Sequence, residues 1–269
     1  AKEATLDTTS GSWQGGDVSI VYKKGEGTLF AAPINAGTYT ASITLGDATA
    51  SVEYTIAKAE AKVEDFTFAA PTDWAYNGSA KTAQVTAKNG ITGMGNITVK
   101  YFIDGSEVTP INTGEYSVKI TVAAGANYNA TTTELTKDDW KFAIGKGDQT
   151  ITVPQNATIV KNGNAVDITG WASVAGVKNG AAPGALSYAL DGTYTGVTLD
   201  KNNKLIVEST SSATTVTIKV TAAETTNYNA AEETFAVTVA DKKPANLSVS
   251  MTGWIYGENA KNPEFKKAA

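Results

Sequence analysis

Five tryptophans carry the clearest potential chemistry in this sequence, because an exposed indole face can stack on a sugar ring. Trp13, Trp140 and Trp171 occur at unrelated places in the chain. A glycan-binding module would present such residues exposed, side by side, over a polar groove. Packing inside a core is the competing interpretation, since tryptophan is largely buried in most proteins. These three residues are therefore the candidates for ligand contact.

The other two tryptophans occur in a repeated setting. Trp74 is followed two residues later by Tyr76, and Trp254 is followed in the same way by Tyr256. Residues two apart on a strand lie on the same face. Because the pair occurs twice, we expect it to have a structural role, in a core or between domains.

Acidic residues offer weaker candidates. Asp138-Asp139 and the loop Asp200–Asn203 could supply oxygen ligands to calcium, but they lack the EF-hand spacing and its distal glutamate. Asp and Asn are common in solvated turns. Glu232-Glu233 could belong to a glycosidase pair, although nothing in the sequence brings two carboxyl groups to within about 5 to 9 Å. We therefore expect no catalytic residue, no metal site and no cofactor.

Three residue types are missing, and their absence excludes several classes of function. The chain has no cysteine and no histidine, and all 22 of its basic residues are lysine. Disulfides, thiolate chemistry, histidine base catalysis and the bidentate recognition of phosphate by arginine are thereby excluded. A net charge of −5 also disfavours nucleic-acid binding. We expect a protein that is not an enzyme.

One covalent modification stays open for a cysteine-free β-protein. An isopeptide bond between lysine and asparagine needs a buried lysine, an asparagine and a carboxylate together. The sequence alone does not single out such a triplet.

A seven-residue motif, written twice, organises the chain. The residues from Pro33 to Tyr39 reappear from Pro110 to Tyr116, 77 positions later. Gly accepts positive φ, Asn favours turns and Pro ends a preceding strand, so the motif predicts a turn. Each copy leads into alternating apolar residues, which predict half-buried strands. The motif residues expected to define the repeat are Pro33, Asn35, Gly37, Tyr39, Pro110, Asn112, Gly114 and Tyr116.

Further repeats divide the chain into four segments: 1–59, 60–147, 148–242 and 243–269. The second and third segments share an Asn-Tyr-Asn-Ala sequence, at 127–130 and 227–230. The last segment begins like the second, with the Trp-x-Tyr opening that the first segment lacks. This complementarity suggests that strands at the two chain ends pair between neighbouring molecules by β-augmentation.

These motifs resemble the MBG domain, especially its YGX type, a mostly-β, glycine-containing repeat of large bacterial surface proteins. The resemblance rests on the Trp-x-Tyr opening, the Pro-Ile-Asn-x-Gly-x-Tyr motif and the Asn-Tyr-Asn-Ala sequence. Segment 1–59 resembles a partial MBG domain, 60–147 a full one, and 243–269 the opening strands of another. Segment 148–242 looks more like a bacterial immunoglobulin-like repeat. The family implies a secreted or wall-attached adhesin-like protein and supplies no catalytic residues.

The sequence thus predicts an all-β chain of tandem immunoglobulin-like or MBG β-sandwich domains in an elongated array. We expect an extracellular segment of a bacterial surface protein, acting as a spacer or adhesion array. Its partners would be host or matrix glycans, proteins, or neighbouring surface proteins. A glycan-binding module using exposed Trp or Tyr is the alternative. No apolar run approaches the roughly 20 residues that a membrane-spanning helix needs, so no membrane insertion is expected.

Overall fold

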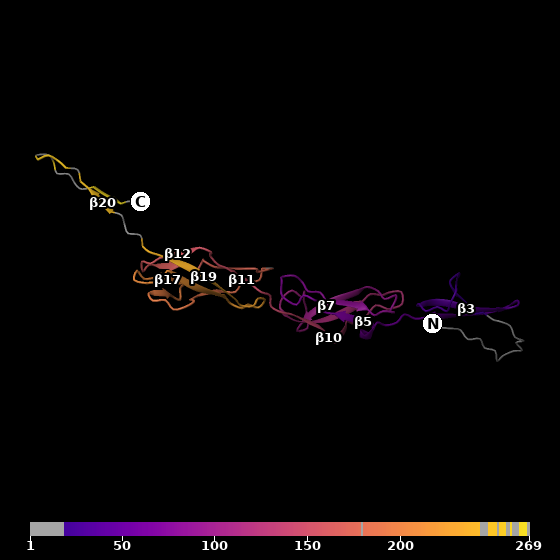
Figure 1. Cartoon of the computed structure of the whole chain (residues 1–269). Helices are drawn as coiled ribbons and strands as arrows, with labels where there is room; N and C mark the ends of the chain where they lie inside the picture. The colour runs from indigo at the N-terminus through magenta and orange to yellow at the C-terminus, as the bar shows by residue number, and fades with distance from the viewer. Residues whose placement is uncertain are drawn as a thin grey trace. The chain divides into compact units, whose positions relative to one another are not determined.

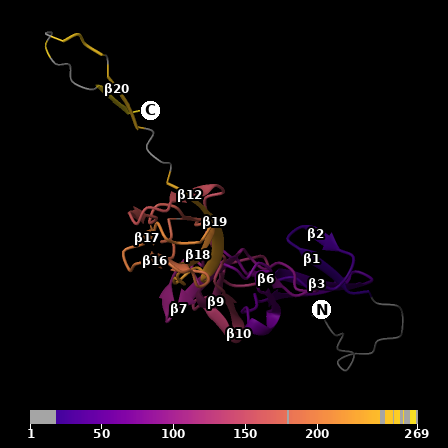
Figure 2. The same cartoon turned by 60° about the vertical axis from the view of Figure 1, so that its left-hand side comes forward.

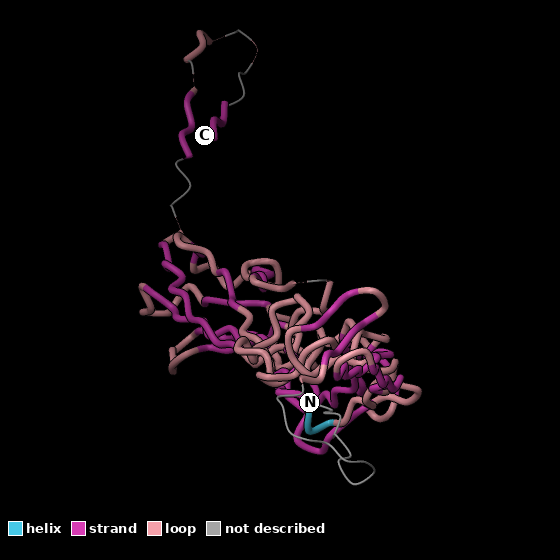
Figure 3. The backbone as a smooth tube through the Cα atoms, turned by 90° about the vertical axis from the view of Figure 1, so that its right-hand side faces the viewer, coloured by secondary structure: helices cyan, strands magenta, loops and turns pink. Residues whose placement is uncertain are grey.

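The computed structural model describes residues 19–178 and 180–242, together with 247–251, 253–256, 259 and 264–267 of the C-terminal segment. The chain divides into two compact units, 1–145 and 146–269 (Figure 1). Strands and loops make up nearly all of the described chain, and its only helical element is one short 3-10 turn (Figure 3). Trp13 lies outside the described residues.

The first sheet of unit 1, named here the N-terminal sheet, has the strand order β2-β1-β3-β4 and is antiparallel throughout. β3 and β4 form its long hairpin, in which Gly37 lies opposite Ile56 and Leu45 lies opposite Ala48. The bounds are β1 Val21–Lys24, β2 Gly27–Leu29, β3 Gly37–Leu45 and β4 Ala48–Ile56.

The rest of unit 1, residues 59–145, is named here the central domain and contains two layers. Its main layer, the central sheet, has the order β10-β9-β7-β8. The second layer is the hairpin β5–β6, whose Phe66 and Phe68 contact Trp140 of β10 at ring-centroid distances of 6.3 and 6.2 Å. The bounds are η1 Val63–Asp65, β5 Phe66–Ala69, β6 Gln84–Ala87, β7 Ile97–Ile103, β8 Ser106–Glu107, β9 Gly114–Val122 and β10 Leu135–Ile144.

Unit 2 is a sandwich of sheets β12-β19-β18-β15 and β13-β17-β16 (Figure 2), and β11 and β14 form a separate two-stranded sheet. Its core contains Val216, Ile218 and Val220 of β18 and Leu205 of β17, all fully buried. The bounds are β11 Thr150–Thr152, β12 Ala157–Val160, β13 Ala165–Asp167, β14 Ser173–Ala175, β15 Leu186–Leu190, β16 Val197–Leu199, β17 Lys204–Val207, β18 Thr215–Ala222 and β19 Ala231–Ala240.

The C-terminal segment contains one further hairpin, formed by β20 Leu247–Ser250 and β21 Glu264–Lys267. Its connecting loop carries Trp254 and Tyr256, just as the loop between β5 and β6 carries Trp74 and Tyr76. The similarity of the two sequence openings is therefore accompanied by a similar arrangement of strands and loop.

The prediction of an all-β fold with several antiparallel sheets is confirmed. Alternation in the sequence correctly predicts which face of the central sheet is buried, since Val118, Ile120 and Val122 of β9 are all at most 2% exposed. A tight turn at Asp104-Gly105 joins β7 to β8. Both residues have positive φ, 48° and 80°, as a two-residue hairpin turn between twisted strands requires.

Candidate functional sites

The repeated Pro-Ile-Asn-x-Gly-x-Tyr motif forms a tyrosine corner in both copies. The Tyr39 hydroxyl donates to the Asn35 carbonyl at 2.9 Å, and the Tyr116 hydroxyl donates to the Asn112 carbonyl at 2.7 Å. A tyrosine that bonds back to the chain a few residues upstream fixes the corner from which its strand begins. Burial raises the pKa of the Tyr116 hydroxyl. The motif is thus structural.

Glycine is required in this corner for its backbone conformation. Gly114 has φ +153° and Gly37 has φ +152°, a region that residues with a side chain rarely adopt. A Cβ at Gly114 would in addition lie 3.2 Å from Ile103 Cδ1. The conformation and the crowding together explain why both copies carry glycine here.

Two of the three tryptophans proposed as ligand contacts pack against other aromatic side chains. Trp140 is 4% exposed, with Phe68 stacked on its ring and Phe66 meeting it edge-on. Trp171 is half-buried and packs against the core of unit 2, 6.1 Å from Phe235. Packing accounts for both positions, and Trp140 has no free face for a sugar.

The recurring tryptophans are exposed, so of the two structural roles expected for them, in a core or between domains, the core role does not fit. Trp74 is 52% exposed and Trp254 is 41% exposed, whereas Tyr76 is buried. The expectation that Trp74 and Tyr76 share a face assumed a strand. The structure instead gives this loop only an isolated bridge between Ala75 and Gly145, so the strand rule does not apply.

The acidic candidates stabilise turns and surface ion pairs. Asp200 Oδ1 accepts the backbone N–H groups of Asn202 and Lys204, both at 2.8 Å, and so closes the hairpin loop. Asp139 pairs with Lys137 at 3.1 Å, and Glu232 pairs with Lys219 at 2.8 Å. No cluster of three or more Asp, Glu, His or Cys residues able to hold a metal ion occurs within the described residues.

A lysine, an asparagine and a carboxylate do meet in the loop between β5 and β6. Lys81 is 5% exposed and forms an ion pair with Asp73 Oδ2, and Asn77 Nδ2 donates to the same oxygen at 2.8 Å. The hydrogen bond from Lys81 lowers the pKa of Asp73. An ionised Asp73 has no proton with which to activate the Asn77 amide, and an ammonium at Lys81 has no lone pair for attack. This arrangement favours an ion pair over an isopeptide bond.

The Asn-Tyr-Asn sequences form loops that hold the chain where it enters each domain. In unit 1, Ala59 N–H donates to the Asn127 carbonyl and Asn129 N–H donates to the Ala59 carbonyl, both at 2.9 Å. In unit 2, Gly147 makes the same two bonds, to Asn227 at 3.0 Å and from Asn229 at 2.9 Å. The same bond pattern therefore fixes the entering chain in both units.

Side chains extend this similarity. Asn129 Nδ2 donates to Glu60 Oε1 at 2.6 Å, and Asn229 Nδ2 donates to Asp148 Oδ1 at 2.9 Å. The repeat of this sequence at an offset of 100 positions was the available signal. The bonds to the entering chain could not be read from it, because the partners lie some 70 to 80 residues earlier.

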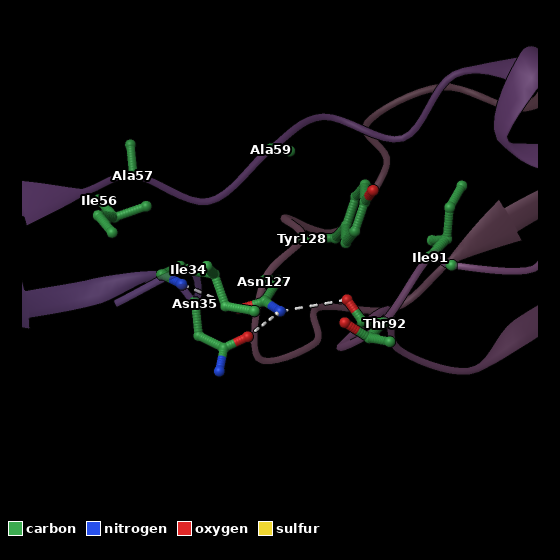
Figure 4. Close-up of a pocket in the computed structure, with 11 residues that line it drawn as sticks. Ile34, Asn35, Ile56, Ala57, Ala59, Ile91, Thr92, Asn127 and Tyr128 are labelled. Atoms are coloured by element: carbon green, nitrogen blue, oxygen red, sulfur yellow. Dashed lines mark hydrogen bonds between the residues drawn. The ribbon is translucent and has the colours of Figure 1, made fainter. Parts of the chain in front are cut away.

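A cavity of about 350 Å³ lies beside the entry loop of unit 1 (Figure 4). Its lining includes Asn35, Ile56, Ile91, Asn127 and Tyr128. Sequence reasoning missed Asn127 as a contact residue. It also missed Gln149, a buried side chain in unit 2 that spans Gly184, Ala223 and Asn229 with three hydrogen bonds.

No helix of the described residues is long and apolar enough to cross a membrane. No family model matches the sequence. No curated protein matches it either.

Among solved structures, the chain is similar to several proteins made of consecutive domains. It matches three domains of Drosophila N-cadherin with 13% identity and a TM-score of 0.27, over 79% of this chain and 80% of that one. Titin domains I67–I69 match with 12% identity and a TM-score of 0.25, over 84% and 88%. Sidekick-1 immunoglobulin domains match with 10% identity and a TM-score of 0.28, over 87% and 56%. At these values the likeness assigns no family.

Proposed function

We propose that this chain is a non-catalytic extracellular segment of a bacterial surface protein, acting as a spacer or adhesion array that presents binding surfaces. One observation carries the proposal: the Asn-Tyr-Asn loops hold the entering chain at Ala59 and at Gly147 with the same hydrogen bonds. Reuse of one joining device is what a tandem array needs. The proposed domains are a partial MBG-like domain at 1–59, an MBG-like domain at 60–147, a bacterial immunoglobulin-like sandwich at 148–242 and the opening strands of a further MBG-like repeat at 243–269.

The partners proposed for such an array are host or matrix glycans and proteins, or neighbouring surface proteins. The roles of its aromatic residues support a spacer. The tyrosine corners and Trp140 serve the packing of the sheets, and the candidates Asp139, Asp200 and Glu232 serve a turn and ion pairs.

A binding screen of the intact chain against a glycan array and host-matrix proteins, with tryptophan fluorescence recorded alongside, tests this proposal. A spacer predicts no specific glycan binding and no emission shift. Specific glycan binding that shifts the emission would overturn the spacer role in favour of a glycan-binding module.

Glycan binding is a second candidate, and one observation favours it: Trp74 is 52% exposed in a loop of the central domain. Trp74→Ala would then abolish glycan binding, whereas Trp171→Ala would leave it unchanged. Loss of binding in Trp171→Ala alone would place the ligand in unit 2.

Pairing of strands between neighbouring molecules is a further part of the proposal. Within unit 1, the loop that carries Ala75 forms a bridge with Gly145, the residue that follows β10. Ala57 follows β4 in the same way, so it offers the equivalent position for a loop of another copy. The loop around Ile255, which is exposed, would pair at Ala57 of a second copy. Deleting residues 243–269 should reduce self-association in sedimentation, and an unchanged assembly state would remove this part.

A further inference from the structure

Contacts between the N-terminal sheet and the central domain converge on one side chain, Asn127 (Figure 4). Its Oδ1 accepts the Ala36 N–H at 2.9 Å. Its Nδ2 donates to Asn35 Oδ1 at 2.9 Å and to the Thr92 carbonyl at 3.2 Å. Both amide hydrogens and the amide oxygen are therefore used. We call these three bonds the Asn127 clasp.

The backbone of Asn127 adds two more bonds. Its N–H donates to the Gly93 carbonyl at 2.8 Å, and its carbonyl accepts the Ala59 N–H at 2.9 Å. One residue is thereby tied to the loop before β3, to the linker after β4 and to the loop before β7. Because its own backbone is held, the Asn127 side chain reaches its partners from a fixed position.

The neighbouring loop leaves room for the Asn127 amide only because it carries glycine. Gly93 has φ +73°, and a Cβ built there would lie 2.6 Å from Asn127 Nδ2, closer than real Cβ contacts allow. An alanine at this position would strain the backbone and displace the amide. Gly93 is thus a second, independent requirement for the clasp.

We propose that the Asn127 clasp is a joint that locks the N-terminal sheet to the central domain in one orientation. Domains joined by a short linker and a small interface move relative to each other by default. Directional hydrogen bonds from one saturated side chain to Asn35 and Ala36 restrict that movement. The joint adds a mechanical element to the proposed spacer, and its test reads orientation, so it can fail while the spacer proposal stands.

Substituting aspartate for Asn127 tests the hydrogen bonds of the clasp without changing the size of the side chain. Asn127→Asp keeps the size of the side chain and the acceptor for Ala36. It replaces the donor with an oxygen that faces the Thr92 backbone carbonyl, which has no donor to offer, and repulsion there should open the clasp. Asn202→Asp adds the same charge in an exposed loop of unit 2 and is the matched control.

The absence of cysteine allows spin labels to be placed without background. Glu53→Cys on β4 and Asp138→Cys on β10 are exposed positions on the two sides of the joint. Electron–electron distance measurements should give one narrow distribution in the parent chain and in Asn202→Asp. Asn127→Asp should widen it about two-fold or more, as expected for a released interdomain joint. Equal widths in all three proteins would overturn the proposal.

Two additional variants make the outcome independent of folding defects. Gly93→Ala should widen the distribution as Asn127→Asp does. A label pair within the central domain, Gln84→Cys with Asp138→Cys, should stay narrow throughout. If either variant disturbs that internal pair, Asn35→Ala decides the question, because it removes a clasp partner from outside the central domain. An unchanged width in Asn35→Ala would then overturn the proposal.

Discussion

The two copies of the tyrosine-corner motif lead into strands of equal length with different surroundings. β3 and β9 each contain nine residues, and each places its tyrosine opposite an aromatic residue, Tyr54 for Tyr39 and Phe142 for Tyr116. At the end of β9, Val122 is 2% exposed. At the end of β3, Leu45 is 52% exposed. The same motif therefore precedes a buried strand in one region and a partly exposed strand in the other.

The second layer accounts for this difference. Trp140 stands two residues before Phe142 and packs under Phe66 and Phe68 of the hairpin β5–β6. Val52 stands two residues before Tyr54 and is 55% exposed. Within residues 19–58, the described part of the first domain, no second sheet covers β3. The motif therefore sets the corner and the register, whereas burial of the strand that follows depends on a covering layer.

The largest effect is expected where the covering layer meets the central sheet. Trp140→Val gives β10 the residue that β4 has at the equivalent position. We expect it to lower the free energy of unfolding of the central domain by about 3 kcal/mol, because it leaves a cavity under two phenylalanine rings. Urea unfolding followed by circular dichroism measures the change.

Trp74→Val is the matched control for this substitution. It removes the same side chain from an exposed position in the same domain and should cost less than about 1 kcal/mol. Similar costs for the two substitutions would contradict the role given to the hairpin layer.

The tyrosine corners give a smaller effect that should be equal in the two regions. Tyr116→Phe and Tyr39→Phe each remove one hydroxyl that bonds a carbonyl four residues upstream. Each should lower the free energy of unfolding by about 1 kcal/mol, the usual value of such a bond. The two domains can be followed separately by hydrogen exchange. Unequal losses would mean that the corner depends on the covering layer.

The sequence was sufficient to predict the strands and the corners because their signals are local. Alternation after Tyr116 predicts which residues of β9 are buried, and Asn-x-Gly predicts the turn before it. The sequence was not sufficient to predict the exposure of Leu45 and Trp74, because burial depends on which other segment covers the residue. The bridge at Ala75 is formed with a residue 70 positions later, and such pairings leave no local pattern.

The role of Asn127 in the clasp could not be predicted from the sequence either. The repeat of Asn-Tyr-Asn-Ala indicates that these loops matter, but the hydrogen bonds of Asn127 reach Asn35 and Ala36 in the preceding domain. Asparagine is common throughout this chain, so composition does not single out Asn127. Only the three-dimensional arrangement distinguishes it from the asparagines that close turns.

The ion pair in the loop between β5 and β6 should make the stability of the central domain modestly dependent on pH. Lys81 lowers the pKa of Asp73 in the folded state. A lowered folded pKa contributes stability that is present above the unfolded value of about 4 and is lost as the pH falls through the lowered folded value. Asp73→Asn should flatten the acid side of the stability profile of the central domain, measured by urea unfolding at a series of pH values. Identical profiles would show that the ion pair contributes nothing.

An intact mass equal to that of the sequence, without loss of ammonia, would support the ion pair between Lys81 and Asp73 over an isopeptide crosslink.

The smallest effect is expected at the exposed end of β3. Leu45→Thr keeps a residue suited to a strand and removes apolar surface that is already half in water, so the free energy of unfolding should change by less than about 0.5 kcal/mol. Val122→Thr, at the equivalent buried position, should cost about 1 to 3 kcal/mol because it buries a hydroxyl. Thermal unfolding of both variants measures this contrast. A cost at Leu45 as large as that at Val122 would mean that a further segment covers β3 in solution, and the contrast between the two strands would then be smaller than the described residues indicate.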